Sequence, residues 1–369
     1  MLSLSCLFEY GNQLIMENIK YFVVHTILIL FILGGACAKQ QSVEDAPPLS
    51  STEIAQPENI IEQVPTDEIS VAINTPKVKE FCKKIEKKFE QLGWISARCE
   101  KNQWHHVRNS YLGDPLMWVV FGDENAHKTD KKDCTMFFCG VHGDETTTIK
   151  FCFDLIDTLL VKPPAYFHDK LVVVVPLVNP DGFFADAPSR TNHRGVDINR
   201  NFPTNDWNKS ALKLWDKKFK KNKRRFPGHH AMSEPETVFH VNIIKRYKPT
   251  KIVSLHSPLS FVDYDGPGDF KKDTNKVGTE ASNLLLQMSE SSKKFRISNY
   301  PFFPGSLGNW AGNERDIPTY TLELPSSDPL KATRYWVLFQ EAIFKVIDKD
   351  LNVLDNSQLQ KVDIEKFED

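Results

Sequence analysis

The sequence lacks several features that would assign it to a simple class. Its formal net charge is only −2 over 369 residues, so no overall electrostatic field points to nucleic acid as a partner. No internal repeat is present, and none of the seven cysteines shows the paired spacing of a zinc site. The longest nearly uncharged apolar stretch, residues 21–35, has a core too short for a comfortable membrane span. Local motifs therefore have to decide the function.

Residues 1–37 are typical of a secretory signal. Lys20 precedes the apolar stretch, and small residues end it in Leu33-Gly34-Gly35-Ala36-Cys37. That ending resembles a bacterial lipobox, although its leucine lies one place too early. A functional lipobox would make Cys37 the lipidated N-terminus of the mature chain. We therefore expect an exported protein of the periplasm or cell envelope, and a lipid or anchor at the N-terminus would attach it to a membrane.

The same leader is also compatible with cleavage near Ala36 or Ala38 without lipidation, and with an uncleaved anchor. Met16 would give a more typical signal length than Met1, so either residue could be the true start.

The cysteines outside the leader number five, because two of the seven lie within it. An odd number in an exported domain leaves at least one free thiol if the others pair. Cys82 and Cys99 are near each other in sequence and could bridge a helix to the following strand, although spacing alone does not establish that geometry. We assign the cysteines no catalytic role.

The chain divides by composition into four parts. After the leader, residues 38–76 are rich in Gln, Ser, Pro and acidic residues without a sustained apolar period, which is typical of a flexible tether. Residues 77–350 form the predicted single catalytic domain, and residues 351–369 form a polar C-terminal tail. A basic run at residues 217–225 (KKFKKNKRR) is usually a solvated face, with contact to an anionic envelope polymer or lipid surface as the alternative.

Strand-like and helix-like segments alternate through the predicted domain. We expect strands at residues 116–121, 135–139, 171–178, 251–255 and 319–324, and helices at residues 79–92, 146–160, 233–247, 274–289 and 330–347. Ser233 and Pro235 give the third of these helices a start signal. Such alternation predicts an α/β fold with a mixed, largely parallel twisted sheet and helices on both faces.

A candidate metal site follows from two short motifs. His142-Gly143-Asp144-Glu145 comes after one predicted strand, and His256 ends another in Ser254-Leu255-His256. Two imidazoles and one carboxylate leave a fourth position open for water, which distinguishes a catalytic zinc from a structural one. Because ligands of open α/β sheets gather beyond the C-terminal ends of the strands, these side chains can meet there. We predict one Zn2+ ion per chain, bound by His142, Glu145 and His256.

The segments around these ligands resemble the zinc carboxypeptidase family. They are Asn179-Pro180-Asp181-Gly182, Gly195-Val196-Asp197-Ile198-Asn199-Arg200-Asn201-Phe202-Pro203 and Thr321-Leu322-Glu323-Leu324, in that order. The resemblance implies that Glu323 is the general base. It also implies that Asn199 and Arg200 bind the free carboxylate beside the scissile bond.

Two further site residues follow from the same resemblance, and a third is suggested by the charge of its side chain. Arg190 matches the arginine that polarises the scissile carbonyl, with Arg194 as the competing candidate. Tyr300 is the candidate for the tyrosine that covers the substrate, and a core or loop role is the alternative. Asp263 is a candidate partner for an amino group of the substrate, together with Asp265, although a turn-forming role suits them equally.

Two local stretches, residues 255–267 and 305–310 with their neighbours, resemble bacterial murein peptide amidases more than animal digestive carboxypeptidases. This implies hydrolysis of the bond between γ-D-glutamate and meso-diaminopimelate, with peptidoglycan stem peptides or muropeptides as partners. A secreted carboxypeptidase acting on ordinary protein or peptide C-termini is the alternative. An inactive wall-binding module is a third hypothesis, and retention of the three ligands and Glu323 argues against it.

Overall fold

The computed structural model describes residues 72–266 and 276–351, without the side chains of residues 276 and 277. All of them belong to one compact unit, Thr66–Asp369. The predicted signal, nearly all of the tether and residues 352–369 lie outside the described residues. No described helix is both long enough and apolar enough to cross a membrane.

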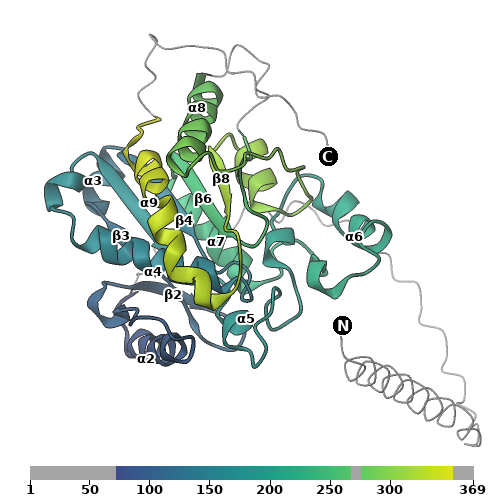
Figure 1. Ribbon diagram of the computed structural model, residues 1–369. Coiled ribbons are helices and arrows are strands. Elements are labelled where there is room, and N and C mark those ends of the chain that lie inside the picture. Colours follow the sequence, from purple (N-terminus) through teal and green to yellow (C-terminus); the bar gives the residue numbers. More distant parts are fainter. Residues whose placement is uncertain (1–71, 267–275, 352–369) are drawn as a thin grey trace, which may run out of the picture. The chain divides into compact units, whose positions relative to one another are not determined.

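Eight strands of the described chain form one mixed sheet in the order β1-β2-β3-β5-β4-β6-β8-β7 (Figure 1). The strands are β1 (Ala72–Ile73), β2 (His105–Asn109), β3 (Pro115–Phe121), β4 (Asp133–Phe138), β5 (Lys170–Val175), β6 (Lys251–His256), β7 (Phe261–Tyr264) and β8 (Thr319–Glu323). Strands β5, β4, β6 and β8 pair in parallel, and the strands outside them pair antiparallel. The predicted mixed sheet is therefore confirmed, with its parallel pairing in the centre.

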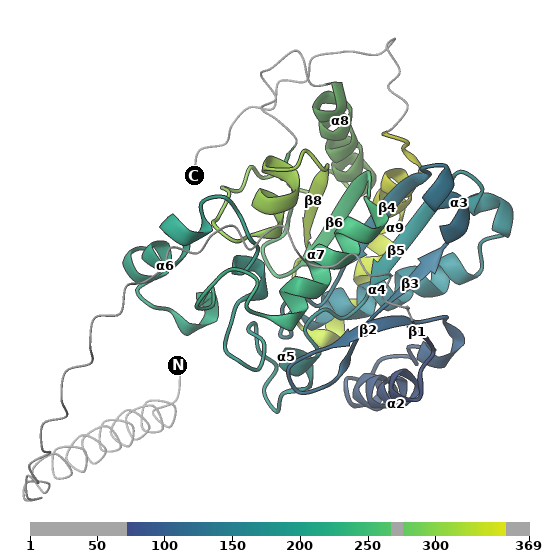
Figure 2. The ribbon, with the colours of Figure 1, turned by 180° about the vertical axis from the view of Figure 1, so that it is seen from behind.

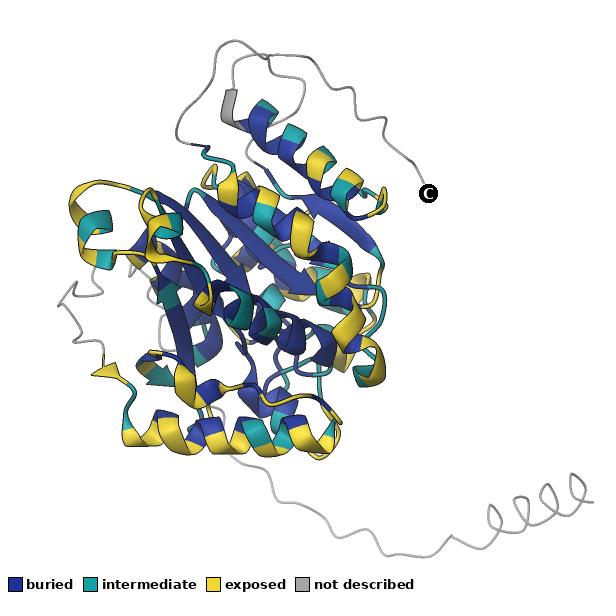
Figure 3. Cartoon of the chain, turned by 60° about the vertical axis from the view of Figure 1, so that its left-hand side comes forward, coloured by how far each residue is buried: buried dark blue, intermediate teal, exposed yellow. Residues whose placement is uncertain are grey.

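Helices cover both faces of this sheet, as predicted (Figures 1 and 2). The described helices are α2 (Pro76–Gln91), α3 (Glu124–Thr129), α4 (Thr146–Leu160), α5 (Pro180–Phe184), α6 (Trp207–Lys217), α7 (Pro235–Tyr247), α8 (Lys276–Ser291) and α9 (Ala332–Asp348), of which α6 lies to the side of the sheet. Neighbouring residues of a strand point to opposite faces, so Phe137 packs in the core below α4 and α9 while Phe138 packs in the core below α7. Consequently the central strands are buried on both sides, whereas helices such as α2 and α9 are buried on one side and exposed on the other (Figure 3).

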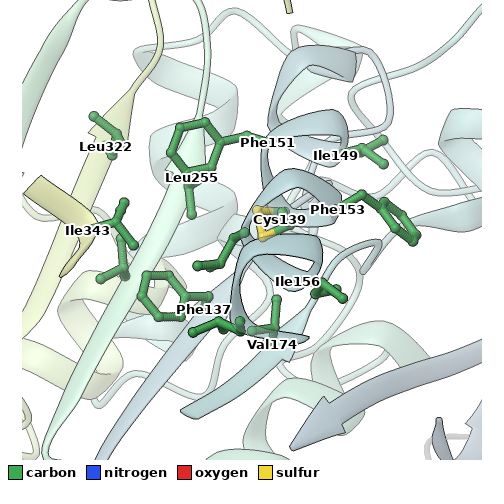
Figure 4. Packing of buried hydrophobic residues seen from close by; sticks show 14 of the residues in the cluster. Phe137, Cys139, Ile149, Phe151, Phe153, Ile156, Val174, Leu255, Leu322 and Ile343 are labelled. Carbon is green, nitrogen blue, oxygen red and sulfur yellow. A yellow bond between two sulfur atoms is a disulfide. The ribbon is translucent and has the colours of Figure 1, made fainter. Parts of the chain in front are cut away.

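The larger core is stapled by a disulfide. Cys139, just after β4, bonds Cys152 of α4 in the middle of the cluster that Figure 4 shows. A second disulfide joins Cys82 of α2 to Cys99, which is the pair that the sequence suggested, although Cys99 lies in a short 3-10 helix and not in a strand. Cys134 is left as a buried free thiol, as an odd cysteine count requires.

Several boundary predictions were wrong; the predicted strand 171–178, for example, ends at Val175. Two of the errors have a clear physical cause. The predicted tether runs to residue 76, but β1 already pairs with β2 at Ala72 and Ile73, and the Thr75 side chain caps α2. The start signal of α7 was also misassigned. Pro235 is the first helical residue, but Ser233 does not cap the helix because its hydroxyl donates to the Glu234 carboxylate and lies against the Asn201 amide.

Candidate active site and metal centre

The candidate site lies at one edge of the parallel part of the sheet. His256 and Glu323 are the last residues of the neighbouring strands β6 and β8, and they are register partners. His142 follows the end of β4, between α4 and that strand. Parallel strands end at a common edge, so residues far apart in sequence converge there.

The tight turn that carries His142 depends on a glycine. A Cβ atom at Gly143 would lie 2.2 Å from the Gly182 carbonyl carbon and 2.3 Å from the Phe183 nitrogen. The backbones of the two motif loops therefore touch, and only glycine leaves room for that approach. Asn179 fixes the second loop by accepting a hydrogen bond from the Gly182 N–H on its side-chain oxygen.

His142, Glu145 and His256, which we call the metal cluster, are brought together as predicted. All three are buried, and their ligating atoms lie within 4.8 Å of one another. Nδ1 of His142 lies 2.7 Å from Glu145 Oε1, Nδ1 of His256 lies 3.0 Å from Glu145 Oε2, and the two Nδ1 atoms are 3.2 Å apart. Two imidazole nitrogens that face one carboxylate in a buried site form the donor set that suits zinc.

The second ring nitrogen of each histidine, Nε2, contacts a polar side chain outside the metal cluster. Asp197 Oδ1 lies 3.1 Å from His142 Nε2, and the Ser254 hydroxyl lies 3.0 Å from His256 Nε2. Such contacts fix the ring orientation and leave Nδ1 for a metal. Burial alone would raise the pKa of Asp197, but the Arg190 guanidinium and His142 lower it well below its usual range.

Arg190 lies beside the metal cluster. Its Nε donates to Asp197 Oδ2 at 2.9 Å, and its Nη1 lies 3.3 Å from Glu145 Oε1. The competing candidate, Arg194, is partly exposed, lies 3.8 Å from Glu234 and stacks over Tyr111. Only Arg190 of the two lines the pocket that contains His142, His256 and Glu323.

Asn199 and Arg200 line the same pocket. The Asn199 side-chain oxygen accepts from the Leu307 N–H at 2.8 Å, and one Arg200 nitrogen donates to the Asn199 carbonyl. Among the described residues Arg200 forms no ion pair, and its buried Nε has no hydrogen-bond partner. Burial lowers the pKa of this guanidinium to about 10. A buried cation without an anion is costly, so the site is complete only with an anionic ligand.

Glu323 lines the pocket without a cationic partner in the described part of the chain. One of its oxygens accepts from the Leu259 N–H at 3.3 Å. Burial raises the pKa of this carboxyl to about 7. A carboxyl group with a pKa near neutrality is suited to accepting and returning a proton.

Asp263 on β7 and Asp265 just after it, which we call the aspartate pair, line the pocket opposite no described cation. Asp263 accepts from the Tyr300 N–H and Asp265 from the Thr321 hydroxyl, each at 3.0 Å. Burial raises the pKa of both carboxyl groups, and the charge of Asp265 adds to the shift at Asp263. Position 308 approaches them closely, because a Cβ at Gly308 would lie 2.3 Å from the Asp265 carboxyl carbon.

Tyr300 lies at the rim of the pocket, 41 % exposed and stacked on Phe261. Two residues of the site were not predicted as site residues: Arg225 lines the pocket, and Asp197 contacts His142 and Arg190 without lining it. Asp197 lies in the quoted Gly195–Pro203 motif but was given no role, and Arg225 was treated only as part of a basic run. Asp144 forms an ion pair with Arg224, with its Oδ2 atom 2.7 Å from Arg224 Nη1.

Comparison with known proteins agrees with this geometry. The model of the zinc carboxypeptidase family matches residues 97–352. Murein peptide amidase A of Escherichia coli K12 is 26 % identical over 247 residues, which cover 66 % of this chain and 90 % of that protein. The protein of the same name from Vibrio campbellii is 29 % identical over 224 residues, covering 58 % and 77 %.

A solved structure supports the fold alone. Carboxypeptidase A from Helicoverpa armigera is 19 % identical, with a TM-score of 0.53 over 74 % of this chain and 72 % of that one. The fold, the family model and the donor set of the metal cluster lead to one conclusion: this chain belongs to the zinc carboxypeptidase family and is a metallopeptidase with Zn2+ as its cofactor.

Proposed function

We propose that the protein hydrolyses the γ-D-glutamyl–meso-diaminopimelate bond of murein stem peptides and so trims or turns over peptidoglycan. One observation carries this proposal: the pocket beside the metal cluster contains both an unpaired buried arginine, Arg200, and the unpaired aspartate pair. A C-terminal residue that fits must therefore present a carboxylate and an ammonium group. The similarity to two proteins named murein peptide amidase A supports the same substrate class.

His142, Glu145 and His256 would hold the metal. A bound zinc ion supplies Lewis-acid chemistry, which makes water a competent nucleophile near neutral pH and polarises a carbonyl. Glu323 takes the proton from the attacking water and passes it to the amine that leaves, since its carboxyl group lies in the pocket and titrates near neutrality.

The arginines orient the substrate. Arg200, beside Asn199, binds the carboxylate of the C-terminal residue, because its buried guanidinium has a free Nε. Arg190 is held by Asp197 and directs its remaining N–H groups toward the pocket that the metal cluster lines, where negative charge develops on the carbonyl oxygen.

The aspartate pair binds the amino group at the far end of diaminopimelate. Burial raises the pKa of both carboxyl groups, and the charge of Asp265 raises the pKa of Asp263 further, so the pair carries less than two full negative charges near neutral pH. One ammonium group between them restores full ionisation and supplies the missing hydrogen-bond donors.

We propose an exported location for this activity. Two disulfides are typical of an oxidising compartment, and residues 1–37 have the composition of a secretory signal. A lipid at Cys37 or an uncleaved anchor would hold the enzyme at a membrane that faces the wall.

The test uses the zinc-loaded full chain and a muramyl tripeptide that ends in meso-diaminopimelate, with products identified by mass spectrometry. We expect release of diaminopimelate that stops with a chelator and is lost in Glu323→Gln. If the tripeptide stays intact while ordinary peptides lose their C-terminal residues, the zinc peptidase stands and the murein assignment fails.

A secreted carboxypeptidase for ordinary C-termini is the second candidate. The aspartate pair is compatible with this second function too, because a C-terminal lysine or arginine also presents a carboxylate and a cation. Comparison of L-linked Lys-ending peptides with the murein tripeptide in the same assay separates the two. An inactive wall-binding module would cleave neither.

A further inference from the structure

Arg225 is a pocket residue that the proposed function leaves without a task. It lies in the basic run 217–225 and, among the residues of that run, it is the one that lines the pocket with Arg200 and the aspartate pair. No described carboxylate forms an ion pair with it. Its guanidinium stacks over Phe219, 4.6 Å from the ring centre, which orients the cation without neutralising it.

The backbone that carries Arg225 is fastened to the site on both sides. The next residue, Phe226, accepts a hydrogen bond on its carbonyl from the Asp197 N–H at 2.8 Å. The preceding residue, Arg224, lies 2.7 Å from Asp144. Both aspartates adjoin the metal cluster: Asp197 contacts His142, and Asp144 precedes Glu145 in the sequence. The position of Arg225 is therefore tied to the metal cluster and is not that of a solvated basic run.

Two aromatic rings link Arg225 to Arg200. Phe219, below Arg225, lies 6.1 Å from Phe303, and Arg200 lies 4.5 Å over Phe303. Both cations thus rest on one pair of rings at the pocket wall, close enough for each charge to affect the other. Two adjacent cations without anions need two negative groups, and one substrate carboxylate satisfies only one of them.

We infer that Arg225 binds the second carboxylate of a diaminodicarboxylic acid at the C-terminus of the substrate. This inference rests on the proposed function and deepens it. Arg200 binds the carboxylate at the scissile end, Arg225 binds the carboxylate at the far end, and the aspartate pair binds the far ammonium group. The pocket then supplies both the positive and the negative partner that a zwitterionic side chain requires. Lysine lacks the second carboxylate, and glutamate lacks the ammonium group.

Two tripeptides that differ only in that carboxylate test the inference. One ends in meso-diaminopimelate and the other in L-lysine, and kcat/KM is measured for both with the zinc-loaded full chain. A charge-assisted contact predicts a preference of roughly 10- to 100-fold for diaminopimelate in the wild type. In Arg225→Met we expect that preference to fall to about 3-fold or less. Arg225→Lys should restore part of it, because the charge returns without the planar fork.

Lys223→Met is the matched control, because Lys223 lies on the same exposed turn but does not line the pocket. Its preference should equal that of the wild type. An unchanged preference in Arg225→Met, or an equal loss of kcat/KM with both substrates, would overturn the inference. The inference would also be overturned if the loss of kcat/KM in Arg225→Met depended on whether the residue before the scissile bond is γ-linked or α-linked. That result would place Arg225 on the other side of the bond.

Product inhibition of the wild type keeps the test independent of how well the variants fold. Free meso-diaminopimelate should inhibit cleavage at roughly one-tenth or less of the concentration of L-lysine required. Equal inhibition by the two amino acids would contradict the inference. Failure of the wild type to cleave either tripeptide would instead contradict the proposed function.

Discussion

Asp197 touches both His142 and Arg190, whereas Asp263 and Asp265 line the pocket and meet no described cation. The first aspartate completes a network of buried opposite charges around the metal cluster. The aspartate pair leaves its charge incomplete. Paired buried charges hold a geometry, while unpaired ones raise the energy of the empty site and are satisfied by a ligand. The difference separates residues that build the site from residues that select its substrate.

The largest expected effect comes from Glu323, which lacks a cationic partner among the described residues, as the aspartate pair does, and is the proposed general base. Glu323→Gln should lower kcat by roughly 10²- to 10⁴-fold, because the proton acceptor is lost. The melting temperature should stay level or rise, since a buried acid without a cation is removed. Calorimetry and product assays measure the two, and zinc content by atomic absorption should match the wild type. A kcat within tenfold of wild type would show that another group is the base.

Asp197→Asn should show the opposite pattern, with a large loss of stability. It leaves Arg190 and the His142 contact without their buried anion, which costs about 3–5 kcal/mol in the free energy of unfolding. Urea denaturation measures it. Asp157→Asn is the control: its ion pair with Arg98 is partly exposed and spans 3.9 Å, so the loss should be about 1 kcal/mol or less. An equal loss of unfolding free energy in the two variants would contradict the conclusion that the paired, buried charge of Asp197 holds the site together.

Asp265→Asn tests the other side of the comparison. Its free energy of unfolding should change by about 1 kcal/mol or less, or increase, because an unpaired buried charge disappears. At the same time kcat/KM for the diaminopimelate tripeptide should fall roughly 10- to 100-fold with the loss of a charge-assisted contact. A destabilisation as large as that of Asp197→Asn would mean that Asp265 holds the structure together.

The smallest effect is a difference in pH dependence, measured by denaturation of the chelator-treated protein. The raised pKa values of the aspartate pair mean that the folded chain keeps protons that the unfolded chain releases near pH 4. Stability from these groups is therefore present in acid and declines, by on the order of 1 kcal/mol or more, as pH rises toward neutrality.

Asp197, whose pKa is lowered, has the reverse dependence: its contribution is present above about pH 4 and is lost only in stronger acid. The Asp263→Asn, Asp265→Asn double variant should therefore flatten the decline toward neutral pH without changing the acid limb. A decline that persists in the double variant would have to come from other buried acids, such as Glu236, whose pKa burial raises to about 7.

The sequence predicted the central strands and the metal cluster because their signals are local. Residues 171–178 form an unbroken apolar run, and the helix at 146–160 was placed at its observed bounds. The short antiparallel strands were missed. β1 has two residues and β7 has four, too few for a period, and each depends on pairing with a distant strand.

The unpredicted site residues have a common cause. Arg225 lies within a run of basic residues whose other members face solvent, so composition concealed the one that turns into the pocket. Asp197 sits in a motif already explained by Asn199 and Arg200, and only the fold shows that it holds His142 and Arg190 together. The contact between His142 and Asp197 spans 55 residues and belongs to no motif that the sequence analysis used.

A single substitution at Gly308 is expected to change the substrate preference of the pocket. The space that a Cβ would need at this position is filled by the carboxyl group of Asp265. Any larger residue there must displace that group, and with it half of the recognition of an ammonium ion. One substitution on the π-helical turn Gly308–Asn313 would thus alter which amino acid is released while leaving the hydrolytic machinery intact. Position 308 is therefore the first position to mutate when the aim is an enzyme that releases neutral or acidic C-terminal residues.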